Sequence, residues 1–276
     1  MADITAAAVK ALREKTGLPL MDCKKALTEC AGDNDKAIQW LRERGLKVMG
    51  GKSDRETAFG RFGIHSGQDK AVGAIVELKC ESAPVAKNEE FIQLANDLAQ
   101  QLATGPGAST ADELLAQSSP SKSGQTLREQ RDDLMNKIRE VFNVGRLSRI
   151  DGATGGYSHN AGTIAGVLAG VKGGSDAVAK DVCMHVAAMK PAALNVADLD
   201  AAEVERERGI LREAALQEGK PENIVDKMVE GRLRSYYAER VLIEQPFVKE
   251  PKQSVGQFAK ENGMEIKQFI HWVLGE

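Results

Sequence analysis

Two stretches of this chain, residues 63–79 and residues 156–172, align with each other without a gap. The first reads GIHSGQDKAVGAIVELK and the second reads GYSHNAGTIAGVLAGVK. Each has two apolar runs across a short polar turn, as in a β-hairpin, and each is followed by residues of helical periodicity. The identical residues are few and mostly small, but the matching order of elements favours duplication. The sequence therefore predicts an α+β fold with a duplicated core of antiparallel sheets covered by helices.

Three short helices are predicted ahead of this core. Thr5 is a suitable N-cap for the first helix, Gly17 ends it, and apolar residues recur at helical spacing through all three. Gly45 is expected to stop the third helix, and residues 49–63, which mix glycine with charge, are expected to form a linker. A module of this size has a marginal core, which is more typical of binding than of chemistry.

The predicted division is a three-helix module at 1–54, a first core subdomain at 55–142 and a second at 143–276. Within the first subdomain, residues 104–126 are rich in Gly, Pro and Ser and predict a surface connection with a short helical patch. A helix over 127–142 and a strand over 146–150 are expected to follow.

Two charged helices with narrow apolar seams are predicted at about 199–240, inserted in the second subdomain. Asp200 can cap the first, and Gly219-Lys220-Pro221 combines a helix stop with a helix start. Two ordinary surface helices are the alternative, but the short turn and narrow seams favour a projecting antiparallel coiled-coil hairpin. A helix from Ser254 to Gly263 and a last strand at 266–274 are expected after it.

Composition excludes several classes of function. Aromatic residues make up 4% of the chain and the formal net charge is −3, which argues against a surface that binds nucleic acid. The four cysteines form no CxxC pair and the four histidines show no metal-ligand spacing, so packed reduced thiols and no bound metal are expected. Neither a secretory signal nor an apolar run of about 18 residues is present, so a cytoplasmic protein without a membrane partner is predicted.

Motifs for covalent chemistry or nucleotide binding are also missing. The glycine-rich stretch at 170–176, GVKGGSD, lacks the GKS or GKT ending of a phosphate-binding loop. Ser158 and Thr163 flank His159, but no pattern near them supplies the orienting residue of a triad. The chain is therefore expected to need no cofactor, to be no enzyme, and to act by contacting another protein.

Residues 77–91, ELKCESAPVAKNEEF, connect the first predicted hairpin to its helix. An apolar run ends there, a charged amphipathic helix pattern begins, and residues 82–85 form the joint between them. An exposed turn on a rigid scaffold often carries function. An ordinary strand-to-helix connection has the same local pattern, so the joint by itself leaves both interpretations open.

Five blocks of sequence together resemble the elongation factor Ts family. They are LREKTGLPLMDCKKAL, ELKCESAPVAKNEEF, HVAAMKP, EGKPENIVDKMVEGR and EQPFVKEPKQSVGQ. They occur in the order of the family and cover nearly the whole chain, and their combination is specific although each block alone is weak. The resemblance implies that the three-helix module is similar to ubiquitin-associated domains.

The resemblance also implies a function, which is guanine-nucleotide exchange on elongation factor Tu. An exchange factor of this family disturbs the Mg²⁺ and phosphate site of its GDP-bound partner, and GTP then loads. Because Mg²⁺ neutralises phosphate charge, its displacement weakens GDP binding. By linkage, the same coupling free energy describes how the factor weakens GDP binding and how GDP weakens binding of the factor.

Candidate site residues follow from the same resemblance. For Mg²⁺ displacement they are Ser82, Ala83, Pro84 and Val85. For partner binding they are Leu12, Thr16, Leu18, Pro19, Met21, Glu81, Lys87 and His159. Leu18, Pro19 and Met21 have two equal interpretations: they form a docking patch, or they close the small core. Glu81 and Lys87 are as well explained as ordinary solvent-exposed residues as they are as partner-binding residues.

The joint departs from the family, whose usual residues there are Thr-Asp-Phe-Val. Here Ala83 and Pro84 stand where the family has a carboxylate and an aromatic ring. Proline is compact and fixed in φ, so it offers less contact area than a phenyl ring. This departure motivates an alternative function, an adaptor that binds through the N-terminal module without promoting exchange. An enzyme with an unrecognised pocket is a third possibility, and the sequence leaves the oligomeric state open.

Overall fold

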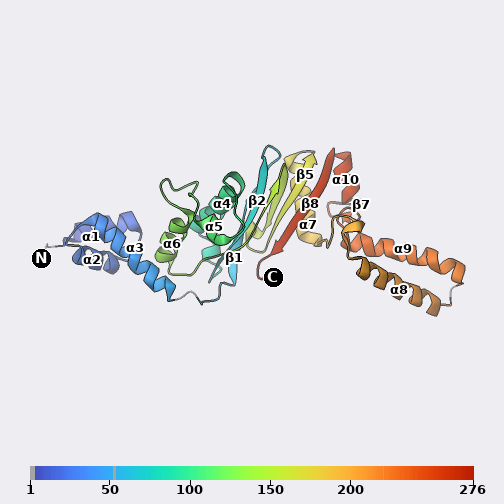
Figure 1. The fold of residues 1–276 in the computed structure, drawn as a ribbon, viewed down its shortest axis with the longest axis horizontal. Helices are drawn as coiled ribbons and strands as arrows, with labels where there is room; N and C mark the ends of the chain where they lie inside the picture. Colours follow the sequence, from blue (N-terminus) through green and yellow to red (C-terminus); the bar gives the residue numbers. More distant parts are fainter. Residues whose placement is uncertain (1–3, 52–53, 220) are drawn as a thin grey trace. The chain divides into compact units, whose positions relative to one another are not determined.

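The structure of this chain is a computed structural model that describes residues 4–51, 54–219 and 221–276 (Figure 1). Helices and small antiparallel sheets alternate along it, which confirms the predicted α+β class. Two compact units are present: unit 1 is Met1–Gly63, Ile75–Ser148 and Leu274–Glu276, and unit 2 is Ile64–Ala74 and Arg149–Val273. The division into domains at 1–54, 55–142 and 143–276 stays a prediction.

Unit 1 begins with α1 (Ala6–Thr16), α2 (Leu20–Glu29) and α3 (Asn34–Gly50). The Thr5 side chain accepts a hydrogen bond from the Ala8 N–H, and Gly17 ends α1 with φ of 69°, as predicted. The expected stop at Gly45 is wrong, because α3 continues to Gly50. A Cβ at residue 45 would lie 2.3 Å from Cγ of Asn136, so this glycine serves the close packing of α3 on α6 (Leu127–Ile138). Residues 52–53 of the predicted linker lie outside the described residues.

These three helices enclose a core of their own. Its buried members are Val9, Leu12, Leu18, Cys23, Ala26, Leu27, Ala37 and Leu41. They come from all three helices and from the loop between α1 and α2, so the module is closed by its own apolar side chains.

Strands β1 (Phe59–His65), β2 (Val72–Cys80) and β3 (Asn143–Asp151) follow one another across a sheet in the order β1-β2-β3. Strand β1 begins at Phe59 and α3 continues to Gly50, so the predicted linker over 49–63 is wrong at residues 49–50 and 59–63. Strand β2 is buried over most of its length, as its continuous apolar run predicts. A short 3₁₀ turn, η1 (Val85–Lys87), then leads to α4 (Glu89–Thr104), α5 (Ala111–Leu115) and α6.

Residues 104–126, which are predicted to be a surface connection, contain buried residues and are hydrogen-bonded to neighbouring helices. Leu114 and Leu115 of α5 are buried, and Thr110 caps that helix in a capping box. The Asp97 carboxylate, 1% exposed, accepts hydrogen bonds from Ser121 Oγ at 2.5 Å and from Gln130 Nε2 at 2.7 Å. A buried polar group needs such partners, so this network ties the connection to α4 and α6.

Helix α6 ends earlier than predicted. The pattern predicts a helix over 127–142, but the last helical residue is Ile138 and Arg139 takes a left-handed conformation with φ of 71°. Val141 and Phe142 are buried beyond the helix end, and the Phe142 ring meets Phe91 edge to face at 4.9 Å between centroids. Tertiary packing of these two apolar residues therefore overrides the local helical pattern.

Unit 2 contains an antiparallel sheet of β4 (Thr154–His159), β5 (Ala165–Gly173) and β8 (Met264–Val273), with β5 in the centre. Helix α7 (Asp176–Met189) packs on this sheet, and its buried residues Ala179, Val182, Cys183 and Val186 share a core with β5. The predicted hairpin, helix and final strand of the second copy are all present. The remaining short elements are η2 (Asn160–Gly162), η3 (Val196–Asp198), β6 (Pro246–Phe247), β7 (Glu250–Ser254) and α10 (Val255–Glu261).

Helices α8 (Ala201–Gln217) and α9 (Glu222–Arg240) run antiparallel to each other (Figure 1). Arg208 pairs with Glu230 and Arg212 with Asp226, so the contacts move backward along α9 as they move forward along α8. Ala215, Val225, Val229 and Leu233 form the buried seam between them. The predicted cap at Asp200 is confirmed, and Lys220 of the predicted turn lies outside the described residues.

His185 is fully buried on α7 and fixes the segment that precedes β7. Its Nδ1 accepts a hydrogen bond from the Val248 N–H at 3.1 Å, so the proton of the neutral ring belongs on Nε2, which lies 2.9 Å from Gln245 Oε1. Burial lowers the pKa of His185 from its ordinary value, and the hydrogen bond to Gln245 opposes that shift only in part. The neutral imidazole is thus the form that the fold stabilises.

Mild acid is therefore expected to destabilise unit 2 through His185. Because its pKa is lower in the folded than in the unfolded state, stability is lost as pH falls below about 6.5, by at most about 1.4 kcal/mol per pH unit. Melting temperatures at pH 7.5 and 5.5, set against those of His185→Gln, measure this loss. His65, whose pKa is also lowered, is present in both proteins and cancels. If the melting temperatures of the two proteins depend equally on pH, His185 is not the source of the acid sensitivity.

Candidate functional site

Only part of the joint at residues 82–85 is exposed to solvent. Ala83 and Pro84 are exposed, Ser82 is half-buried, and Val85 is 9% exposed. Pro84 has φ of −60° and ψ of −37°, and its carbonyl accepts a hydrogen bond from the Lys87 N–H at 3.1 Å, which closes the turn η1. The exposed part of the joint is therefore the Ala83-Pro84 pair.

Two carboxylates hold the joint in place. Ser82 donates from its Oγ to Glu140 Oε1 at 2.6 Å and from its N–H to Glu140 Oε2 at 3.1 Å. The neighbouring Glu81 carboxylate accepts from the Val141 N–H at 2.8 Å and pairs with Arg55 at 3.1 Å. Ser82 and Glu81 are thus committed to contacts within the chain, while Lys87 is exposed at the far end of the turn.

The base of the joint is apolar and well packed. Ala86 is 2% exposed, and its carbonyl accepts a hydrogen bond from Arg61 Nη1 at 3.0 Å. Burial raises the pKa of the Cys80 thiol to about 12, so the thiol stays protonated and donates to the Ser82 carbonyl at 3.3 Å. Asn88 then caps α4 by accepting from the N–H groups of Glu90 and Phe91. The turn is thus held in place on both sides by contacts within the chain.

The N-terminal candidates divide between core and surface. Leu12 is 1% exposed and Leu18 is 6% exposed, so both close the core of the module. Thr16 donates from its Oγ1 to the Leu12 carbonyl at 2.7 Å, a bond that stays inside the module. Pro19 is exposed and Met21 is 71% exposed. Leu20, which the sequence reasoning did not single out, is 47% exposed between them. Residues 19–21, which span the N-cap and the first two residues of α2, are therefore the exposed apolar surface of this region and are called the N-terminal loop below.

His159 lies in unit 2, whereas the joint and the N-terminal loop lie in unit 1. The His159 side chain is exposed at the end of β4, where its Nδ1 is 3.2 Å from the hydroxyl of Tyr157. Asn160 and Ala161 follow it with φ of 51° and 54° in the turn to β5. Non-glycine residues seldom adopt this conformation, so the turn is strained.

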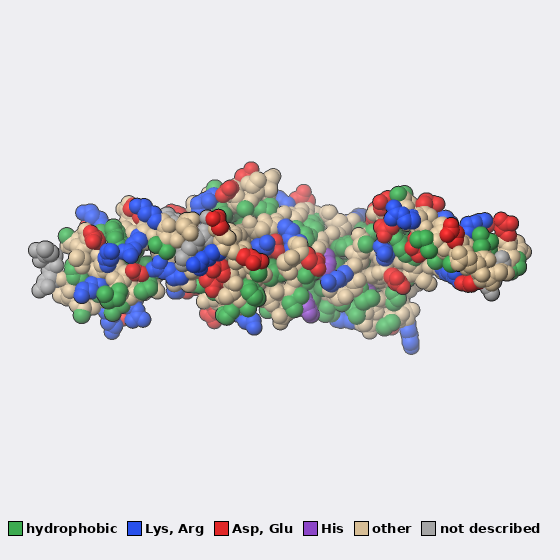
Figure 2. All heavy atoms as spheres, turned by 90° about the horizontal axis from the view of Figure 1, so that it is seen from below, with side chains coloured by type: hydrophobic (Ala, Val, Ile, Leu, Met, Phe, Trp, Pro, Cys, Tyr) green, Lys and Arg blue, Asp and Glu red, His purple; other side chains and the backbone are tan. Residues whose placement is uncertain are grey.

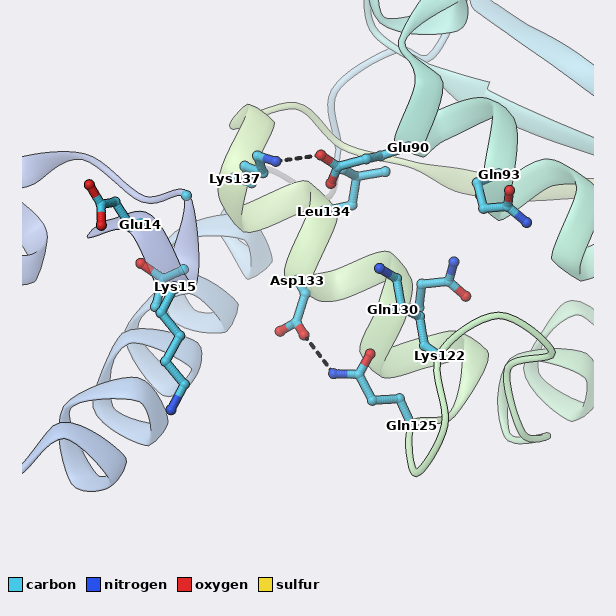
Figure 3. A pocket seen from close by; sticks show the side chains of 12 residues that line it. Glu14, Lys15, Glu90, Gln93, Lys122, Gln125, Gln130, Asp133, Leu134 and Lys137 are labelled. Carbon is cyan, nitrogen blue, oxygen red and sulfur yellow. Dashed lines mark hydrogen bonds and ion pairs between the residues drawn. The ribbon is translucent and has the colours of Figure 1, made fainter. Parts of the chain in front are cut away.

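A cavity of about 520 Å³ opens in unit 1 between the end of α1 and helices α4 and α6 (Figure 3). Its lining is polar and of mixed charge: Lys137 pairs with Glu90 across it, and Gln125 donates to Asp133 at 3.2 Å. The surface drawn in Figure 2 likewise shows acidic and basic side chains interspersed. Neither view shows a concentrated field of one sign that would hold a phosphate chain.

Metal and membrane binding are not suggested by the part of the chain that the structure describes. Within it, no group of three or more His, Cys, Asp or Glu side chains is placed to hold a metal ion. None of the helices over 4–51, 54–219 and 221–276 combines the length and the apolar character needed to cross a bilayer. The four thiols are free, and Cys23, Cys80 and Cys183 are buried.

Sequence reasoning missed Arg139 and Glu140, which contact the candidate residues and their neighbours directly. Glu140 binds Ser82, and Arg139 Nη2 donates to Asp22 Oδ2 at 2.6 Å beside the exposed N-terminal loop. The residues were placed inside a predicted helix, and neither is a glycine or a proline that would mark its end. No local signal reveals them, because their role depends on which distant residues fold against them.

Comparisons with known proteins agree on one family. The family model described as Elongation factor TS matches residues 81–276. A protein of Methylococcus capsulatus named Elongation factor Ts is 40% identical over 276 residues, covering 99% of this chain and 92% of that protein. One of Hyphomonas neptunium with the same name is 41% identical over 289 residues, covering 100% of this chain and 93% of that protein. The chain therefore belongs to the elongation factor Ts family.

Proposed function

We propose that this chain promotes guanine-nucleotide exchange on elongation factor Tu in the cytoplasm, as its family implies. The observation that carries the proposal is the joint: an exposed Ala83-Pro84 pair held on a turn that is fixed from both sides. A rigid protrusion can press into a nucleotide site without losing entropy on contact. Displacing Mg²⁺ would release GDP through coupling of the two binding equilibria, and no covalent step by this chain is required.

The roles of the joint residues differ in this proposal. Ala83 and Pro84 are the contacting residues, while Ser82 and Val85 position them from beneath. Pro84 carries the larger apolar surface but replaces a ring that the family usually has. Losing contact area at an interface anchor costs about 2 kcal/mol or more, so the rest of the interface is expected to carry more of the binding energy here.

Several finer features belong to the same proposal. The three-helix module at 1–54 is a ubiquitin-associated-like domain that docks through residues 19–21, with Leu12, Thr16 and Leu18 supporting that loop from the core. The α8–α9 pair is a coiled-coil hairpin inserted at about 199–240, and the two hairpin-plus-helix units are copies of one ancestral subdomain. Glu81 supports the joint, and Lys87 and His159 are further candidates for contact with elongation factor Tu.

Release of a fluorescent GDP from elongation factor Tu of the same organism tests the proposal. The chain is expected to accelerate release in a saturable way, as a function of its concentration and with excess unlabelled GTP present. An unchanged release rate at saturating chain, together with stable binding to another protein, would overturn exchange and support the adaptor alternative that the altered joint motivates.

Pro84→Gly is expected to slow the maximal release rate about tenfold or more. Glycine removes the apolar ring and frees φ, so both the contact area and the preorganisation of the turn are lost. Pro106→Gly is a matched control, since Pro106 is also exposed but lies outside the joint. Equal release rates for Pro84→Gly and the unaltered chain would show that Pro84 does not contact the nucleotide site.

A further inference from the structure

We propose that residues 139–141, just beyond α6, form a bracket that positions the exposed N-terminal loop and the joint relative to each other. The bracket residues contact both surfaces and belong to neither. The inference rests on the proposed exchange function for its consequence, although the bracket itself is a property of the free chain.

One end of the bracket holds the N-terminal module. Arg139 Nη2 donates to Asp22 Oδ2 at 2.6 Å, and Asp22 lies in the first turn of α2 directly after Met21. Both side chains are half-buried, with 36% and 25% of their surface exposed, so solvent screens this pair less than a fully exposed one. The contact therefore fixes the start of α2 and the apolar residues 19–21 that precede Asp22.

The other end holds the joint. Glu140 accepts two hydrogen bonds from Ser82, one from the hydroxyl and one from the backbone N–H. Val141 donates its N–H to Glu81 Oε1 at 2.8 Å. Two consecutive bracket residues thus hold Ser82 of the joint and its neighbour Glu81, directly before the exposed Ala83-Pro84 pair.

The bracket is rigid because of how α6 ends. Arg139 takes a left-handed conformation, and its N–H donates to the Met135 carbonyl at 2.8 Å, which closes the last turn of the helix. Val141 and Phe142, 3% and 0% exposed, anchor the chain in the core immediately afterwards. A non-glycine residue persists at this φ only where its surroundings determine it. The two grips are therefore one residue apart on a segment held at both ends.

This arrangement assigns separable roles to adjacent residues. Arg139 sets the position of the loop that would bind elongation factor Tu, so its loss is expected to weaken binding. Glu140 sets the position of the pair that would disturb the Mg²⁺ site, so its loss is expected to slow release once the complex has formed. Both are positioning residues, since neither is argued to touch the nucleotide.

Nucleotide-release kinetics over a range of chain concentrations separate the two roles. Arg139→Asp is expected to raise the half-saturating concentration about tenfold and to change the maximal rate less than twofold. Glu140→Ala is expected to lower the maximal rate about fivefold and to leave half-saturation within twofold. Reversal of the pair, Asp22→Arg with Arg139→Asp, is expected to recover at least half of the lost affinity.

Arg128→Asp is the matched control for charge reversal. Arg128 lies in the first turn of α6, and it pairs with an exposed carboxylate, Asp112, at 2.8 Å. It is expected to leave both kinetic parameters within twofold. If Arg139→Asp and Glu140→Ala behave like this control, or if both variants change both parameters in parallel with a lowered melting temperature, the bracket is overturned as a positioning device.

Amide hydrogen exchange on the free chain tests the bracket without elongation factor Tu. Glu140→Ala is expected to raise the exchange rate of the Ser82 N–H at least tenfold, and Arg139→Asp to raise exchange at residues 22–24. Absence of both changes overturns the bracket even if nucleotide release is accelerated normally. Conversely, both changes in a chain that does not accelerate release would uphold the bracket and overturn the proposed function.

Discussion

Replacing Arg146 by Met is expected to lower the free energy of unfolding of the chain by about 3 kcal/mol. The reason is Glu77, whose side chain is 3% exposed in the middle of β2. Its carboxylate receives Arg146 Nη2 at 2.8 Å and Nε at 3.1 Å, and the Arg146 N–H at 3.3 Å. Without the guanidinium, a buried charge keeps only the backbone donor and is poorly paired. Urea denaturation at pH 7, followed by circular dichroism, measures the loss.

A double variant distinguishes the lost pair from lost packing. Glu77→Leu combined with Arg146→Met replaces both charges with apolar side chains of similar size and is expected to recover stability to within about 1 kcal/mol. Arg149→Met is the surface control, because Arg149 faces an exposed Asp151 at 3.7 Å. Its cost is expected to stay below about 0.5 kcal/mol. If Arg146→Met is as stable as Arg149→Met, the ion pair between Arg146 and Glu77 does not stabilise the fold.

Phe91→Ala is expected to cost about 4 kcal/mol. Phe91 is fully buried at the start of α4, directly behind the joint, and its ring packs on Phe142 with an interplanar angle of 76°. Removing it leaves a cavity and also loses the edge-to-face contact. Because Phe142 follows the bracket, the same variant is expected to raise hydrogen exchange at residues 139–142.

Phe59→Ala supplies the comparison for this second substitution. Phe59 begins β1 and is 45% exposed, so the same change in size there is expected to cost about 1 kcal/mol or less. Equal losses for the two variants, measured by denaturant midpoint at constant slope, would mean that the Phe91 site collapses around the smaller side chain.

Local patterns predicted the elements where local physics decides them. Caps at Thr5, Asp200 and Ser254 and the left-handed glycine at residue 17 act within one helical turn, so the sequence near them is sufficient. The same holds for the hairpins, whose apolar runs and polar turns are contiguous. Gly45 shows the limit of such reasoning. A glycine at this position suggests the end of a helix, but the residue that it packs against, Asn136, is distant in sequence.

The candidate site divides along the same line. Its position at residues 82–85 follows from the motif, and its departure from the family is visible in the letters Ala83 and Pro84. The exposure of only those two residues does not follow, because burial of Val85 and engagement of Ser82 depend on α6 and the segment after it. In the N-terminal loop, the structure places Leu18 in the core and Met21 on the surface, and a docking role for the exposed residues stays a prediction.

The sequence by itself determined the family, the fold class, the order of elements and the place of the joint, since each depends on motifs or on periodicity along a contiguous stretch. Only the tertiary structure decided where α6 ends, which joint residues are exposed, and that Arg139 and Glu140 connect the joint to the N-terminal module. The physical reason is that these features arise between residues distant in sequence. Burial of Phe142 against Phe91 and the pairing of Glu140 with Ser82 outweigh the weak preference of residues 139–142 for a helix.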